Sequence, residues 1–438
     1  MDFLSSVELN DHDSGLDIFS KPTYTANFNN QSDVIIQPTS PPSDSPHATY
    51  TFILGGKDDK LYSIPSSLKI FGRFRVSLQN GDSLTNELLA PVVNFPESIF
   101  ENIAVSLNGI PISDHGRGYP FKSYITKKLS LNSLTKQSTL LAHYWIEDSE
   151  LPDIKLDSNN LSTQFTERSK LIQKSQDVHF IFSPLVDILN TEKYIPPRTE
   201  LRLDLEKGPV SFPLLSPDET LNLKINVLDI NMSIRRFSPY HTLAIEHEKR
   251  FLSGSEINLP FTRSTIRYRT LHTGILSTVV PSIFTGQLPY SLLVGFLTNE
   301  QQSMLSYNPF VFKSHGLKRF SVIKNGVSTP QEGVQVGSED GSFLRGYEHF
   351  IQNTGGSIFN SQNGISPIDY FNKSFFIAYD FTPDFCLGAH NHENESGTID
   401  LCLQFESPTK YPLTLLIVAC YENNIIISKN DVKLDYSL

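Results

Sequence analysis

The feature that most constrains the fold is a two-residue period of apolar side chains, which recurs from about residue 48 onward. One side of the segment 68–78 carries Leu68, Ile70, Phe74, Val76 and Leu78, and the other carries Lys69, Arg73, Arg75 and Ser77. The same alternation occurs in residues 201–205 and 399–405. Successive side chains of a strand point to opposite faces, so this period predicts strands with one buried face. The sequence therefore predicts an all-β protein.

The period changes phase within residues 221–234. Leu221, Leu223, Ile225 and Val227 are in phase, and Leu228, Ile230, Met232 and Ile234 continue one residue later. We expect a β-bulge at Val227-Leu228, because one extra residue restores inward pointing. Helices are expected to be few and short. Ser183-Pro184 and Ser238-Pro239 predict helix starts, the second for residues 240–250, because Ser caps helices and Pro suits the first turn.

An ordered set of motifs occurs twice along the chain. A strand ending in Asn108-Gly109 is repeated as a strand ending in Asn325-Gly326, 217 residues later. Asn-Gly accepts the positive φ angles of tight hairpins. A strand running into Ser183-Pro184 recurs before Thr382-Pro383, and two alternating strands close each half. This repeat predicts two copies of one domain. A jelly roll, with two facing four-stranded sheets, fits the spacing, and other β-sandwiches also fit.

The chain of 438 residues is long enough for two domains. We expect an extended arm at residues 1–47, a first jelly roll at 48–237, a helical linker at 238–250 and a second jelly roll at 251–438. The arm holds seven acidic residues against Lys21 alone, so it is not a basic nucleic-acid-binding tail. Its Pro, Ser and Thr content makes a packed core unexpected there. An inter-subunit tie is a role that suits it.

Composition also limits location and partners. No uninterrupted apolar run approaches the roughly 20 residues of a membrane-spanning helix, and residues 1–8 show no secretory signal. We therefore expect synthesis in the cytoplasm and no transmembrane segment. Cys386, Cys402 and Cys420 are widely spaced, and we expect core thiols rather than disulfides. A net charge of -11 argues against a protein that coats nucleic acid.

Several segments resemble catalytic or nucleotide-binding motifs but lack required residues. His247-Glu248 begins like a zinc-protease helix, but Phe251 stands where the second His ligand belongs. Residues 55–58 lack parts of a phosphate-binding loop, and Gly116-Arg117-Gly118 leads to Tyr119-Pro120, where a dinucleotide fingerprint would open a helix. We expect these segments to be loops or surface. No Gly-x-Ser-x-Gly elbow occurs. We expect no catalytic residues and no cofactor, so the protein is predicted not to be an enzyme.

Two alternatives keep a ligand-binding function open. His390, His392 and Glu393 could supply the ligands of a metal-dependent, cupin-like jelly-roll enzyme. Their surroundings of Gly, Asn and Ser favour a solvated turn instead, so no metal is predicted. A carbohydrate-binding β-sandwich would need exposed aromatic platforms. Trp145 is the single tryptophan, which counts against that function.

Several segments, taken in order, resemble a family. They are Leu16-Asp17-Ile18-Phe19 with Pro22-Thr23, Leu107-Asn108-Gly109, Tyr119-Pro120-Phe121, Tyr194-Ile195-Pro196-Pro197, Gly286-Gln287-Leu288-Pro289, Asn308-Pro309-Phe310 and Tyr379-Asp380-Phe381-Thr382-Pro383. Their order and spacing resemble the double jelly-roll major capsid proteins of Polinton (Maverick) and adintovirus-like elements. The likeness covers nearly the whole chain. Leu16, Asp17, Ile18, Phe19 and Pro22 match the arm motif of that family.

The resemblance implies a homotrimer of double jelly rolls that forms a pseudo-hexagonal capsomer and tiles an icosahedral shell around a double-stranded DNA element. The implied partners are neighbouring capsomers, a single jelly-roll penton protein and other minor capsid proteins. The implied location is the virion, with assembly in either the nucleus or the cytoplasm. A closed three-fold assembly of a chain with two like domains presents six similar edges, which agrees with this expectation.

Overall fold

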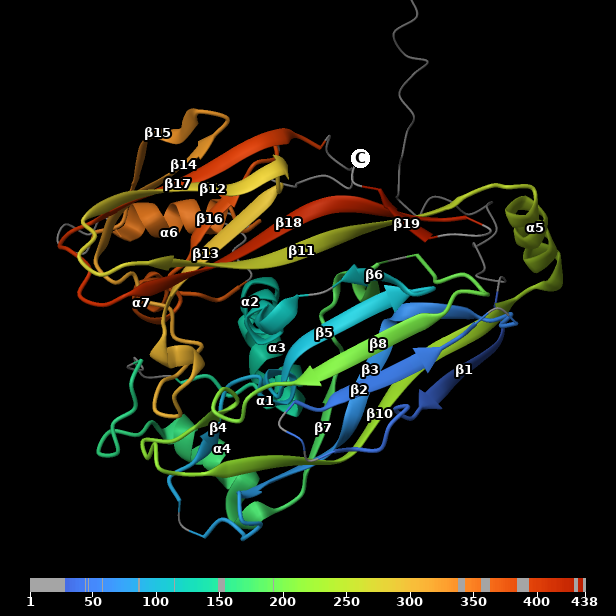
Figure 1. The fold of residues 1–438 in the computed structure, drawn as a ribbon, viewed down its shortest axis with the longest axis horizontal. Helices are drawn as coiled ribbons and strands as arrows, with labels where there is room; N and C mark the ends of the chain where they lie inside the picture. Colours follow the sequence, from blue (N-terminus) through green and yellow to red (C-terminus); the bar gives the residue numbers. More distant parts are fainter. Residues whose placement is uncertain are drawn as a thin grey trace, which may run out of the picture.

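The computed structural model describes residues 28–43, 45, 47–56, 58–85, 87–113, 115–148, 154–191, 193–337, 343–355, 363–383, 394–428 and 432–435. Antiparallel strands dominate, which confirms the predicted all-β class (Figure 1). None of the α-helices within these residues is longer than 12 residues.

The elements fall into two successive groups of strands. The first-half strands are β1 (Phe28–Ile36), β2 (Thr49–Leu54), β3 (Tyr62–Leu78), β4 (Ala90–Pro91), β5 (Phe100–Leu107), β6 (Ile110–Ser113), β7 (Val178–Phe182), β8 (Leu201–Lys207), β9 (Leu214–Leu215) and β10 (Leu223–Pro239). The second-half strands are β11 (Ile257–Leu271), β12 (Ser277–Gln287), β13 (Ser291–Thr298), β14 (Leu317–Lys324), β15 (Val327–Gln335), β16 (Ile377–Asp380), β17 (Ser396–Phe405), β18 (Leu413–Ile427) and β19 (Val432–Asp435).

Helices connect these strands. The α-helices are α1 (Phe95–Ser98), α2 (Tyr119–Ser130), α3 (Ser133–Gln137), α4 (Thr163–Ile172), α5 (His241–Leu252), α6 (Phe343–Gln352) and α7 (Pro367–Lys373). The 3₁₀ helices are η1 (Gly116–Gly118), η2 (Thr139–His143), η3 (Gln173–Ser175), η4 (Asp187–Asn190) and η5 (Glu300–Gln302).

The two halves have the same strand order. The sheets of the first half are β1-β10-β3-β7 and β2-β8-β5-β6, and those of the second are β11-β18-β13-β16 and β12-β17-β14-β15. The short β4-β9 pair and β19, which extends β18, lie outside this pattern. With eight strands counted along each half, both halves read 1-8-3-6 and 2-7-4-5. Two facing four-stranded sheets in this order form a jelly roll, so the chain is a double jelly roll.

The duplicated motifs occupy equivalent places in the two jelly rolls. Asn108-Gly109 joins β5 to β6, and Asn325-Gly326 joins β14 to β15, with φ of 48° and 80° in the first turn and 51° and 82° in the second. Each Asn side chain also accepts a backbone hydrogen bond from the neighbouring strand of its sheet, at the start of β8 in the first half and from β17 in the second. The amide of Glu200 donates to Oδ1 of Asn108 over 2.8 Å. The amide of Thr398 donates to Oδ1 of Asn325 over 2.9 Å. Each turn is thereby tied to its neighbouring strand.

The bulge in β10 lies where the phase change predicts it. The pairing with β3 runs through Val227 and resumes at Asp229, so Leu228 is skipped. Leu228 is 38% exposed, and the expectation that it points inward was wrong, because the extra residue itself is the one displaced outward. Gly72 in β3 allows the close approach of the bulge. A Cβ at Gly72 would lie 2.0 Å from the carbonyl oxygen of Asp229.

The predicted helix starts need correction. Ser183-Pro184 does not cap a helix, and only the 3₁₀ helix η4 follows, from Asp187. Ser238-Pro239 ends β10, while the expected second helix is α5, with Tyr240 at its N-cap. Tyr119-Pro120, expected in a loop, opens α2, because Pro is tolerated in a first helical turn. The sheets around α2 are antiparallel, unlike a dinucleotide-binding fold.

Two further expectations differ from the structure. Residues 28–36, assigned to the arm, form β1 at the edge of a sheet, where the side chains of residues 30–36 are exposed or at most half-buried, so no row of buried apolar residues marks the strand. The Oδ1 atom of Asp33 accepts a hydrogen bond from Arg235 of β10 over 2.8 Å. Cys402 and Cys420 are only partly buried, so they are not core thiols, and Cys386 lies outside the described residues.

We predict that Gly72→Ala lowers the free energy of unfolding by about 1–3 kcal/mol, because the new methyl group collides with backbone that cannot move without opening the bulge. Urea unfolding followed by circular dichroism measures the change. Leu228→Ser is the control, because this side chain points outward and its loss should change stability by less than about 0.5 kcal/mol. Equal effects of the two substitutions would contradict this account of the bulge.

Candidate functional site

Strand direction gives the molecule two different ends. In each jelly roll the first strand pairs antiparallel with the last, β1 with β10 and β11 with β18, so the chain enters and leaves at the same end. Helix α5 connects β10 to β11 at that end and stands beside the two sheets (Figure 1). The segments that carry α1 to α4 and α6 to α7 connect strands at the opposite end. The two jelly rolls therefore lie side by side with the same polarity.

Aromatic side chains join the two jelly rolls. Tyr124 of α2 stacks on Phe310 of the second half, with ring centroids 4.4 Å apart, and on Trp145 at 5.2 Å. Phe121 of α2 lies edge-on to Phe310 and Phe312. All five rings are buried, and they are continuous with the core of the second jelly roll. The helices of the first jelly roll thus complete the hydrophobic core of the second.

The sheet β11-β18-β13-β16 is covered on its outer face by the first jelly roll. Residues on both faces of β18 are buried over most of its length. Gly118 in η1 packs against β11, because a Cβ there would lie 2.7 Å from the Ile266 side chain. Backbone pairing adds to this contact, since Leu156 donates to Ser306 over 2.7 Å and Asn308 donates to Ile154 over 2.8 Å.

A buried carboxylate fixes the register of the two jelly rolls. Asp187 of η4 is ion-paired with Lys122 of α2 and accepts a hydrogen bond from Ser113 of β6 over 3.1 Å. From the second half, Ser264 of β11 donates its amide to Oδ2 over 2.9 Å and its hydroxyl to Oδ1 over 2.8 Å. His115 lies 3.9 Å from the same carboxylate. One side chain therefore binds groups from both jelly rolls.

The charge state of Asp187 follows from these partners. Burial by itself raises the pKa of this carboxyl group, but the Lys122 ammonium, His115 and the hydrogen bonds from Lys122 and Ser264 outweigh burial and hold the pKa below its usual value. The Asp187 carboxyl group is thus ionised at neutral pH. A buried ion pair of this kind contributes little more to the free energy of unfolding than apolar side chains of similar volume would. Removal of one partner, however, leaves an uncompensated buried charge.

We predict that Asp187→Ala lowers the free energy of unfolding at pH 7 by about 3–5 kcal/mol, because the buried ammonium group of Lys122 loses its carboxylate partner. The folded pKa is below the unfolded value of about 3.9, so the stabilisation is complete above about pH 4 and is lost as the pH falls through the folded pKa. Denaturant unfolding at several pH values measures the difference between wild type and variant.

Glu248→Gln provides the matched control. Glu248 forms an ion pair of 2.7 Å with Arg198, and both side chains are about half exposed. We expect its loss to cost no more than about 1 kcal/mol at pH 7. A larger effect at Glu248 than at Asp187 would contradict the role given to the buried pair.

The outer face of the sheet β1-β10-β3-β7 is exposed and rich in cations. It carries Lys69, Arg73, Arg75, Lys224 and Arg235 against the carboxylates of Asp33, Asp177 and Asp229. Two exposed apolar residues, Ile35 and Ile181, lie on the edge strands β1 and β7 of this sheet. This positive face contrasts with the net charge of -11 of the chain.

A second exposed surface is formed by β15 and α6. Val327 is 66% exposed at the start of β15, and Leu344 is 52% exposed on α6. Glu332 of β15 and Glu348 and Arg345 of α6 are exposed in the same elements. Strand β15 is the edge of its sheet, because its described pairing is with β14 alone.

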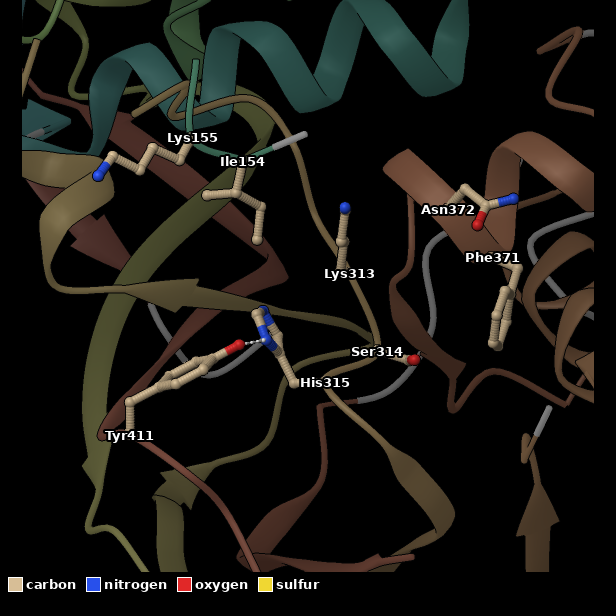
Figure 2. A pocket seen from close by; sticks show the side chains of 8 residues that line it. All are labelled: Ile154, Lys155, Lys313, Ser314, His315, Phe371, Asn372 and Tyr411. Atoms are coloured by element: carbon tan, nitrogen blue, oxygen red, sulfur yellow. Dashed lines mark hydrogen bonds between the residues drawn. The ribbon is translucent and has the colours of Figure 1, made fainter. Parts of the chain in front are cut away.

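A cavity of about 490 Å3 lies between the jelly rolls, next to the loop after β13 (Figure 2). Its lining residues are Ile154, Lys155, Lys313, Ser314, His315, Phe371, Asn372 and Tyr411. Burial, followed by the Lys313 charge, lowers the pKa of His315 to about 4, and its Nδ1 atom is 2.9 Å from the Tyr411 hydroxyl. This described lining has no carboxylate to pair with the neutral imidazole, so it offers no acid–base pair.

The other residues singled out from the sequence do not come together as a site within the described part of the chain. The arm motif Leu16, Asp17, Ile18, Phe19 and Pro22 lies outside the described residues, as do His390, His392 and Glu393. Trp145 is buried against Tyr124 and cannot form an exposed stacking platform. Among the residues that the structure describes, no cluster of three or more His, Cys, Asp or Glu side chains is arranged to hold a metal ion. Within those same ranges, no helix is both long and apolar enough to cross a bilayer.

Similar proteins are found both by sequence and by fold. No family model matches the sequence. A Caenorhabditis elegans protein, described as "Uncharacterized protein F54H12.2", is 20% identical over 344 residues, which cover 76% of this chain and 79% of that protein. Among solved structures, a chain of the Sputnik virophage has a TM-score of 0.61 and 13% identity, with 97% of this chain and 92% of that chain covered.

Two other viral structures are similar over nearly their full lengths. A chain of the PBCV-1 virus capsid has a TM-score of 0.56 and 10% identity, covering 96% of this chain and 100% of that one. The mavirus major capsid protein has a TM-score of 0.54 and 9% identity, covering 97% and 93%. The chain has the fold of viral double jelly-roll major capsid proteins. At these identities the likeness concerns the double jelly roll itself.

Proposed function

We propose that this double jelly roll is a major capsid protein, three copies of which form a pseudo-hexagonal capsomer that tiles an icosahedral shell. The observation that carries the proposal is the repetition of one strand order in two jelly rolls that lie side by side with the same polarity. Three such chains around an axis present six like domains. The end-to-end likeness to viral capsid folds supports the same function.

The proposal includes a genetic source and partners. We place the chain with Polinton (Maverick) and adintovirus-like elements, on the motifs from Leu107-Asn108-Gly109 to Tyr379-Asp380-Phe381. The shell would enclose double-stranded DNA without a basic tail, since the N-terminal region is acidic. Its partners would be neighbouring capsomers, a single jelly-roll penton protein and minor capsid proteins, and its location the virion. In this proposal the protein is structural and has no catalytic activity.

We also propose a division of the chain that takes account of β1. The arm would comprise residues 1–27, and the two jelly rolls would begin at β1 and β11, with α5 as the linker between them. Strand β1 pairs along β10, which makes it part of the first jelly roll.

We predict that the purified chain is a trimer, with a mass about three times the 49.3 kDa of one chain. Light scattering after gel filtration measures the mass, and negative-stain micrographs should show ring-like particles with six lobes. A monomer at every concentration tested would contradict the capsid function. Stoichiometric iron or manganese in the purified protein would instead support the metal-dependent enzyme.

A second prediction concerns the arm. Deletion of residues 2–27 leaves β1 in place, so we expect folded trimers that form fewer or no shells, because the deleted segment ties capsomers together. Micrographs of particles formed by the two chains measure shell yield. A chain in which a Gly-Ser segment of equal length replaces residues 2–27 controls for arm length. Shells from the deletion variant in wild-type yield would show that the arm has no role in assembly.

A further inference from the structure

The contact inside the chain joins two unlike surfaces. The first jelly roll supplies what we call the edge surface, formed by β6, η1, α2 and η4. The second supplies the face surface, which is the outer face of β11-β18-β13. Gly118 against Ile266 and Asp187 against Ser264 are part of this contact. The edge surface of one jelly roll is therefore complementary to the face surface of the other.

Each jelly roll has both kinds of surface, because both have the same strand order. In the second jelly roll, β15 is the equivalent of β6, and α6 is the first described α-helix after it, as α2 is the first α-helix after β6. In the first jelly roll, the outer face of β10-β3 with β1 and β7 is the equivalent of the face surface. One edge surface and one face surface are used within the chain, so one of each is left over.

A closed ring of three chains needs a head-to-tail contact between unlike surfaces. The left-over edge and face surfaces meet this requirement, since they are unlike and belong to opposite jelly rolls. Two surfaces of the same kind would give a two-fold contact instead. The internal repeat therefore indicates which surface of one copy contacts which surface of the next.

We propose that the edge surface of β15 and α6 in one copy packs on the outer face of the sheet β1-β10-β3-β7 in the next copy. This inference rests on the proposed capsid function and specifies the contact that closes its trimer. The partner is a second copy of this chain, which would bring its own pair of surfaces and so close the ring.

Exposed apolar side chains on both surfaces support this pairing. On the edge surface, Val327 and Leu344 are more than half exposed. On the face surface, Ile35 is 65% exposed and Ile181 is 39% exposed, and Phe71, which pairs with Ile181, is partly exposed. Contact with another copy would bury these groups, and burial of apolar area is the main source of association free energy.

The charges of the two surfaces have opposite sign. The face surface has five cations and three carboxylates, and two of these cations, Arg73 and Arg75, share Asp177. Strand β15 and helix α6 themselves contribute Glu332 and Glu348 with one cation, Arg345. Opposite charges favour this pairing over a contact between two copies of the same surface.

Charge reversal on one surface tests the contact. We expect the double substitution Lys69→Glu with Arg73→Glu to abolish the trimer, and Glu332→Lys with Glu348→Lys to do the same, as measured by mass photometry. All four side chains are at least partly exposed, so the monomers should keep the wild-type circular dichroism spectrum. The chain with all four substitutions should regain trimers. Each contact then joins a reversed edge surface to a reversed face surface, so the two charges are again opposite.

Mixing the two double variants gives a sharper result. In an equimolar mixture, every contact between unlike variants pairs either two unmodified or two reversed surfaces, so dimers of unlike variants should form. A closed ring of three would always include one repulsive contact between two copies of the same variant, so the mixture should form few trimers. Arg202→Glu, on the outer face of the sheet β2-β8-β5-β6, is the matched control and should leave the trimer intact.

The outcomes separate this inference from the capsid proposal. A wild-type chain that is not trimeric contradicts the proposed function. A trimeric wild type whose double variants remain trimeric, or whose trimer is lost in Arg202→Glu, overturns the assigned surfaces and leaves the capsid function standing. Restored trimers in the fourfold variant, together with dimers in the mixture, establish the head-to-tail contact.

Discussion

The structure depends on the buried contact through which the helices after β6 fill the core of the second jelly roll. Tyr124 stacks between Trp145 and Phe310, and Asp187 ties α2 to β11. Aromatic area supplies most of the attraction, while the hydrogen-bonded carboxylate selects one register, because any other would leave the buried carboxylate without its two hydrogen bonds from Ser264. Two jelly rolls that share a core in this way move as one body. A tile for a shell needs that rigidity, since small tilts between its halves would accumulate around a closed surface.

Elements with one buried face were predictable from the sequence. The alternation in β3, β8 and β17 reports a core on one side and solvent on the other. Asn108-Gly109 and Asn325-Gly326 revealed the duplication, because tight hairpins admit few residues at positive φ. The bulge in β10 was visible for a similar reason, since an inserted residue shifts the phase of every residue after it.

Other elements gave no such signal. The described side chains of β1 are exposed or only half-buried, so no row of buried apolar residues marks this strand. Strand β18 is buried on both sides, which conceals the face that it turns toward the first jelly roll. Tyr119-Pro120 suggested a loop because the support for α2 comes from Phe310 and Phe312, nearly 200 residues away. The surfaces left for other copies required coordinates, because residues such as Lys69 and Glu332 are ordinary solvent-facing side chains when considered alone.

The shared polarity of the two jelly rolls separates the tasks of the molecule in space. Both chain entry points and the connecting helix α5 lie at one end, and the long helix-bearing connections lie at the other. In a shell, one end would line the interior and the other would meet the environment. Insertions between β6 and β7, or between β15 and β16, can then lengthen and diversify under selection from a host, while the end that lines the interior keeps its sequence. The fold thus allows the two sides of a container wall to evolve at different rates.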